Sequence, residues 1–407
     1  MSSKFKKISF PRDNQAHRSI IEWWYFNGHL WDKTGKHYSF MDCLFKINPK
    51  KAKIPFVSKI LLKERLITIP YIYFAHSVIT DITKQKNYKK IQYVSLVSRD
   101  SFKRPLLFIN YADPTAISGY TNCEIVETPT SLREAGQANQ FNFHLKSENL
   151  DLQLKSNKKP LLEGGHGYIK PCNRRYYYYS LTDLYAKGTI AVNKKIIEVE
   201  GRGWMDHQWA NIAYNYSHMD KWSWFSLKLE NGLDIMLFEY DDCLHKEYQA
   251  DMINAGGRQE HFKKALLTPG KDIWHSKKTK AKYPLSWTIN IPDKDIKLEV
   301  NSLRLDQEMI FNTINYWEAP LTVRGTMSGK KVKGIGFIEL VGYPSDYNFL
   351  ILTTKDINKK IQKELKKSRK RIFSKIKQKL PKISHLTTKE GLKWNTRLRQ
   401  NKFIINK

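Results

Sequence analysis

The chain has 407 residues and a formal net charge of +31, with 41% hydrophobic and 13% aromatic residues. This length allows two domains with sizeable cores, and the apolar content excludes a disordered chain. No uncharged apolar run is long enough to form a membrane-spanning helix, and no apolar segment of a secretion signal follows the first lysines. We therefore expect a globular, cytoplasmic protein.

The four cysteines lie far apart in the sequence and show no paired spacing. We interpret them as reduced and mostly buried thiols, not as a disulfide or zinc framework. The basic residues are unevenly distributed, because residues 355–407 contain 19 Lys and Arg against 3 Asp and Glu. Scattered lysines supply the rest of the excess positive charge, as expected from a genome-wide bias in composition. Nucleic-acid binding is disfavoured, because the aromatic residues fall in motifs that look internal.

In chain order, residues 1–354 are predicted to form β-strands. Segments such as His37–Ile47, Gln140–Ser147 and Leu150–Ser156 alternate apolar and polar residues, and turn-forming residues separate them. Helical periodicity is scarce before residue 355. This pattern favours antiparallel sheets that are closed into barrels or packed as sandwiches.

The tryptophan-rich hairpins of the two halves resemble each other. Glu22–Gly35 aligns with Lys221–Gly232, so that Leu30 matches Leu229 and each segment ends in a glycine turn. A second pair of segments, Lys187–His207 and Arg324–Leu340, aligns if the second loop is four residues shorter. The matched pairs are then Gly188 with Gly325, Gly201 with Gly334, Gly203 with Gly336, and Asp206 with Glu339. We infer two copies of one β-domain, joined near residues 211–220.

The C-terminal segment has a different periodicity. Asp356 is a suitable helix N-cap, and apolar residues recur at steps of four or seven from Ile357 to Leu380, before Pro381. The result is a basic amphipathic helix. It can lie on an anionic membrane surface, which would make the protein peripheral at a membrane, or it can pack on its own β-domain.

The stretch GRGWMDHQW, Gly201–Trp209, places Asp206 beside His207 in a frame of glycine and tryptophan. The pair is either a reactive centre or the polar end of a buried strand. The matched position of Glu339 in the second half supports a packing role for the acid. His207 has no such counterpart, so any chemistry is expected where the two copies differ.

Three motifs together carry a family resemblance: EWWY at Glu22–Tyr25, DHQW at Asp206–Trp209, and YWE ending at Glu318. With them the chain resembles AttH-like proteins and carotenoid 1,2-hydratases (hydroxyneurosporene synthases) from His17 to Pro344. The resemblance implies an all-β fold of two tandem lipocalin-like antiparallel β-barrels. The expected domains are residues 1–212 and 213–354, followed by the basic helical tail of residues 355–407.

The resemblance also implies chemistry, namely proton-initiated hydration of an isolated double bond in an apolar isoprenoid. Asp206 falls on the proton donor of the hydratase pattern, with His207 beside it, and its expected burial among Trp204 and Trp209 would raise its pKa. Trp204 replaces a hydratase tyrosine. Tyr177 and Tyr179 replace a His-x-aromatic element, so carotenoid hydration itself is not transferred to this chain.

A further set of large side chains is expected to line the ligand site, although each can instead serve the core or a strand anchor. These candidate ligand-binding residues are Glu22, Trp24, Trp209, Trp222, Trp224 and Trp317. The histidines show no HxH or HExxH spacing, so we expect no metal site and no cofactor.

The functional hypothesis is that the protein binds a small apolar molecule, isoprenoid-like or lipid-like. Acid-assisted hydration, hydrolysis or cyclisation would then use Asp206 as the proton donor, as in a hydratase (lyase) or a hydrolase-like enzyme. The alternative is a non-catalytic carrier of a hydrophobic ligand. The sequence leaves open which of the two is correct.

Overall fold

In the computed structural model, the described part of the chain is almost entirely β-structure. The described residues are 6–10, 12–14, 16–48, 51, 72–93, 124–127, 141–147, 149–171, 174–212, 221–241, 246–311 and 314–343. The predicted tail helix and Cys123, Cys172 and Cys243 lie outside them, whereas Cys43 is a buried free thiol. None of the helices described is long and apolar enough to cross a membrane.

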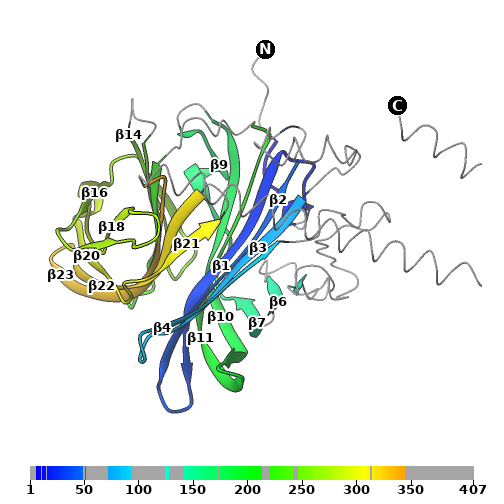
Figure 1. Ribbon diagram of the computed structural model, residues 1–407. Helices are drawn as coiled ribbons and strands as arrows, with labels where there is room; N and C mark the ends of the chain where they lie inside the picture. Colours follow the sequence, from blue (N-terminus) through cyan, green and yellow to red (C-terminus); the bar gives the residue numbers. More distant parts are fainter. Residues whose placement is uncertain are drawn as a thin grey trace, which may run out of the picture. The chain divides into compact units, whose positions relative to one another are not determined.

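The first sheet has eleven antiparallel strands in the order β4-β3-β2-β1-β11-β10-β7-β6-β5, with β8 and β9 paired to β10. The strands are β1 (Ile21–Asp32), β2 (His37–Ile47), β3 (Ile72–Asp81), β4 (Lys86–Tyr93), β5 (Glu124–Glu127), β6 (Asn142–Ser147), β7 (Leu150–Ser156), β8 (Leu161–Leu162), β9 (Tyr168–Ile169), β10 (Tyr176–Val192) and β11 (Lys195–Ala210). In Figure 1 the long blue β1 runs beside β11.

The second sheet has ten strands in the order β15-β14-β13-β12-β23-β22-β20-β19-β16, with β21 paired to β22. The strands are β12 (Lys221–Leu229), β13 (Asp234–Asp241), β14 (Lys246–Ile253), β15 (Gln259–Phe262), β16 (Leu266–Pro269), β19 (Ser286–Ile291), β20 (Ile296–Ser302), β21 (Glu308–Phe311), β22 (Ile314–Met327) and β23 (Lys330–Val341). The remaining elements are a small ribbon of β17 (Ile273–His275) and β18 (Lys282–Pro284) and the 3₁₀ turns η1 (Arg12–Asn14), η3 (Glu163–Gly165) and η5 (Pro292–Lys294).

The strand order and register confirm the internal repeat. Each sheet places its first strand beside its last, β1 against β11 and β12 against β23. Leu30 pairs with Gly201 in the first sheet, and Leu229 pairs with Gly334 in the second, as the sequence alignment predicts. The all-β antiparallel prediction is therefore confirmed, whereas the division of the chain at residues 212 and 354 stays a prediction.

The glycine at this repeated position is required by a close backbone approach. A methyl group on Gly201 would lie 2.0 Å from the carbonyl oxygen of His29, and one on Gly334 would lie 2.1 Å from that of Lys228. We expect Gly201→Ala to lower the free energy of unfolding by about 1–3 kcal/mol, because backbone must move to admit the methyl group. Chemical denaturation checks this, with Gly256→Ala as control, since the nearest atom there is 3.4 Å away. Equal losses in both variants would contradict the steric argument.

Each sheet curls around its own apolar core. The first core contains Trp24, Phe26 and Met205, and the second contains Phe225 and Trp317. In β1 and β11 these core residues alternate with side chains that point to the opposite face. That opposite face of the first sheet contacts the second sheet: Tyr25 donates a hydrogen bond to Glu318, and Trp224 donates one to Tyr178.

Candidate functional site

Asp206 and His207 are neighbours in β11, so their side chains point to opposite faces of the strand. His207 faces the first core beside Met205 and Trp209. Asp206 faces away from that core, toward the contact between the two sheets. The interpretation of the two residues as one reactive pair is therefore wrong, because a strand cannot direct adjacent side chains into one site. There are two polar clusters instead.

The inter-sheet cluster is built around the carboxyl group of Asp206. Its Oδ1 atom accepts hydrogen bonds from Ser180 Oγ and Trp204 Nε1, each at 2.6 Å, and its Oδ2 atom accepts one from Tyr178 Oη at 2.8 Å. Tyr178 in turn accepts from Trp224 Nε1 of the second sheet at 2.9 Å. The carboxyl group is thus held by side chains of both sheets and framed by two indole rings.

Burial dominates the electrostatics of Asp206. Loss of solvation raises its pKa from 3.8 to about 7, although the hydrogen bonds from Ser180, Trp204 and Tyr178 act in the opposite direction. The charge of Glu339 adds to the rise. An aspartic acid in this environment retains its proton over much of the neutral range, as a general acid requires.

Two further carboxyl groups of the second sheet belong to the same cluster. Glu318 and Glu339 lie directly opposite each other in β22 and β23, and Trp222 Nε1 donates to Glu339 at 2.5 Å. Burial raises the pKa of both, and the charge of Glu339 raises that of Glu318 further. Like-charged groups this close cannot both ionise easily, so the pair retains a proton.

The raised pKa of Asp206 has a consequence for stability. The folded state holds this proton more tightly than the unfolded chain does. The stability that Asp206 contributes is therefore fully present below pH 4 and is lost as the pH rises to about 7. Because asparagine does not ionise, Asp206→Asn should remove this decrease in stability with rising pH. We expect the variant to unfold near the wild-type temperature at pH 4.5 and to be the more stable protein at pH 8, by a few kcal/mol. Thermal melts across this range check it, and parallel curves would contradict the assignment.

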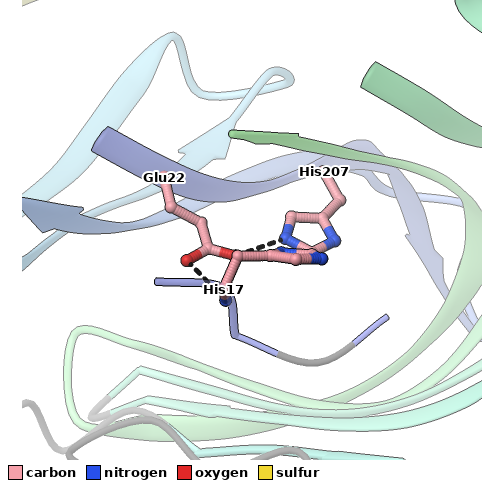
Figure 2. A group of neighbouring side chains, drawn as sticks. All are labelled: His17, Glu22 and His207. Carbon is pink, nitrogen blue, oxygen red and sulfur yellow. Dashed lines mark hydrogen bonds and ion pairs between the residues drawn. The ribbon is translucent and has the colours of Figure 1, made fainter. Parts of the chain in front are cut away.

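The interior cluster lies on the other face of β11 and is built around Glu22 of β1 (Figure 2). Glu22 Oε1 lies 2.8 Å from His17 Nδ1 and 3.0 Å from His207 Nε2, while Oε2 accepts from Lys46 Nζ at 2.8 Å. Glu22 and His207 are fully buried, and Lys46 is only 4% exposed. His17 precedes β1, so the network fastens the N-terminal segment to the sheet.

The partners of Glu22 decide its charge. Burial alone would raise its pKa, but the hydrogen bonds from His17 and His207 and the charge of Lys46 hold that pKa far below its ordinary value. Burial lowers the pKa of His207 to about 4, so its imidazole is neutral at neutral pH. The carboxylate therefore stays ionised and pairs with the ammonium group of Lys46.

Within the described residues, His17, Glu22 and His207 form a group whose ligand atoms all lie within 4.8 Å of one another. Their sequence spacing gave no sign of it, because Glu22 and His207 come from opposite ends of the first half. Two imidazoles and a carboxylate are ligands that a transition metal accepts. Here the three side chains bond to one another, and Lys46 already neutralises the carboxylate, so the group is satisfied without a cation.

The predicted site residues divide between these two faces. Trp204, Trp222 and Trp224 lie at the inter-sheet cluster with Asp206, and Trp317 packs in the second core. The others accompany His207: Trp24 and Tyr179 contact its ring, Glu22 bonds to it, and Tyr177 stacks on Trp209. The expectation that Trp209 frames Asp206 is wrong, since Trp224 occupies that place. Tyr178, Ser180 and Glu163 were not predicted.

The profile of the AttH-like family, compared with the sequence, matches residues 2–343. The chain belongs to the AttH-like family. A crystal structure of an AttH-type protein from Nitrosomonas europaea superposes with a TM-score of 0.64 and 24% identity, covering 84% of this chain and 98% of that one. This likeness confirms the lipocalin-like fold.

Two curated relatives of this AttH-like chain carry the names of enzymes. The dehydratase asqC of Emericella nidulans is 25% identical over 207 residues, which are 47% of this chain and 57% of the relative. The kievitone hydratase of Fusarium solani subsp. phaseoli is 22% identical over 247 residues, which are 58% of this chain and 69% of that enzyme. The match thus spans little more than half of the first relative.

Proposed function

We propose that this protein adds water across a carbon–carbon double bond of a small apolar molecule, or forms such a double bond by removing water, with Asp206 as the proton donor. The observation that carries this proposal is the buried carboxyl group of Asp206, which three side chains hold between indole rings. The dehydratase and hydratase activities named for two relatives support the same reaction class.

The proposed reaction has three steps. Asp206 gives its proton to one alkene carbon, and the π electrons form the new C–H bond. The adjacent carbon becomes cationic, a state that an indole face stabilises. Two indole rings lie at the acid, Trp204 and Trp224, packed edge to face with their ring centroids 6.3 Å apart. Water then adds through its oxygen lone pair, and the Asp206 carboxylate takes the surplus proton. Dehydration is the same sequence in reverse.

Labelled water tests the proposal directly. The purified full chain is incubated in ¹⁸O-enriched water with kievitone and with a panel of linear isoprenoid alkenes, and products are analysed by mass spectrometry. We expect a product that carries one oxygen atom from the solvent. If compounds of the panel bind, yet none gains or loses water, the protein is a carrier of apolar ligands and the enzymatic proposal fails.

A further inference from the structure

The buried carboxyl group of Asp206 is connected to the second sheet through a continuous chain of hydrogen bonds. Ser180 Oγ lies 2.6 Å from Asp206 Oδ1 and also 2.6 Å from Oε1 of Glu163, in the 3₁₀ turn η3. Ser180 has a single hydroxyl proton, so it cannot donate to both carboxyl groups at once. One of the two must therefore carry a proton and donate it to the serine oxygen.

The chain of hydrogen bonds continues from Glu163 into the second sheet. The other oxygen of Glu163, Oε2, is buried and accepts from no N–H or O–H donor among the residues described. The carboxyl group of Asp251 in β14 is held beside this turn, since the backbone N–H of Gly164 donates to Asp251 Oδ2 at 3.1 Å, and burial together with the nearness of Asp251 raises the pKa of Glu163. Two carboxyl groups bond to each other only through a shared proton. Asp251 Oδ1 lies 2.8 Å from Nδ1 of His261 in β15.

The outer end of this chain of hydrogen bonds, at His261, is accessible to solvent. The side chain of His261 is 25% exposed, whereas Asp251 is 1% exposed and Glu163 and Ser180 are fully buried. Asp206 itself is 4% exposed. Every link between solvent and the proposed acid is thus a group that can both accept and release a proton, and imidazole is the common proton shuttle near neutral pH.

We propose that this chain of hydrogen bonds is a proton relay that exchanges the proton of Asp206 with solvent. Its members, from the acid outward, are Ser180, Glu163, Asp251 and His261. This inference rests on the proposed function, because the relay sets the protonation state in which Asp206, the proposed acid, would begin each turnover. It adds four positioning residues that act through Asp206 and do not touch the substrate.

The relay conserves atoms and charge. When Asp206 has lost its proton, Ser180 passes its hydroxyl proton to Oδ1 and takes one from Glu163 Oε1. Glu163 regains a proton at Oε2 from Asp251, which takes one from His261 Nδ1, and the imidazole takes one from water at Nε2. Only O–H and N–H bonds are broken and formed, so no oxidant or further reactant is needed.

Hydrogen–deuterium exchange of the acid tests the relay in the full chain without any substrate. The protein at pH 6 is mixed rapidly with D₂O, and infrared spectroscopy follows the carboxylic C=O band of Asp206, identified as the band that Asp206→Asn removes. We expect Glu163→Gln and Ser180→Ala to slow its exchange by about 10²-fold or more, the scale of a lost proton-transfer group. Ser180→Thr, which keeps the hydroxyl, should exchange near the wild-type rate.

Controls separate a relay from a structural network. Glu198→Gln makes the same substitution at an exposed position of β11 and should leave the exchange rate unchanged. Far-ultraviolet circular dichroism and thermal melts establish that each variant is folded, and His261→Gln provides a second test at the accessible end. Wild-type exchange rates in folded Glu163→Gln and His261→Gln would overturn the relay but leave the proposed acid intact. A spectrum in which Asp206→Asn removes no band would overturn both.

Discussion

Asp206→Asn is expected to lower the rate of hydration or dehydration by about 10²- to 10⁴-fold, the usual contribution of a positioned general acid. Asparagine has nearly the same size and can still accept from Ser180 and Trp204, so the surroundings should persist. It has no acidic proton, and the first step, protonation of carbon, is therefore lost. Turnover of the compound found in labelled water is the measurement.

Ligand affinity distinguishes this effect from a damaged site. We expect the dissociation constant of the apolar compound, measured by tryptophan fluorescence, to change little in Asp206→Asn. Asp293→Asn, on the exposed turn η5, makes the same chemical change away from both clusters and should retain full turnover. Wild-type turnover in Asp206→Asn would remove this residue from the reaction.

Glu22→Ala is expected to produce the largest loss of stability, about 3–5 kcal/mol in the free energy of unfolding. The substitution leaves the ammonium group of Lys46, which is 4% exposed, without its carboxylate in the interior cluster. It also removes the acceptor of His17 and His207 and so releases the segment before β1 from the sheet. Urea denaturation near neutral pH provides the measurement.

A double substitution shows whether the unpaired charge is the cause. Lys46→Met combined with Glu22→Gln removes both charges and keeps a polar acceptor for the histidines, so part of the lost stability should return. The exposed pair of Lys33 with Glu198 serves as control, and removing it should change stability little. If Glu22→Ala behaves like that control, the interior cluster does not anchor the fold.

Much of the fold could be predicted because it repeats. The glycines that align between the halves are required by the same close approach in both sheets, so the alignment of Gly201 with Gly334 carried three-dimensional information. The alternation of side chains along a strand could also have predicted that Asp206 and His207 lie on different faces, since adjacent residues of a strand point to opposite sides. The contiguous DHQW motif concealed that separation.

The neighbours of Asp206 could not be predicted because of one irregularity in β10. Counting from the hairpin turn, the register that pairs Ala186 with Gly201 would place Leu181 opposite Asp206. A bulge between Leu181 and Leu184 shifts the register by one residue, so Ser180 lies there instead. A shift of one residue exchanges the two faces of a strand. Tyr178 and Ser180 therefore face the acid, whereas the predicted Tyr177 and Tyr179 face the first core.

The other missed residues depend on tertiary contacts. Glu163 lies in a turn between strands, and its link to Asp251 forms only when η3 packs against the second sheet. His17 likewise joins Glu22 from a segment without strand periodicity. No local pattern in the sequence encodes either approach.

The protonation state of Asp206 is the most direct test of its role as an acid. Infrared difference spectra of the wild type minus Asp206→Asn, recorded from pH 5 to pH 9, isolate the carboxyl group of this residue. The proposal predicts a protonated C=O band at pH 5 that disappears with a midpoint near the pKa of about 7. A group that is already ionised at pH 5 would contradict it.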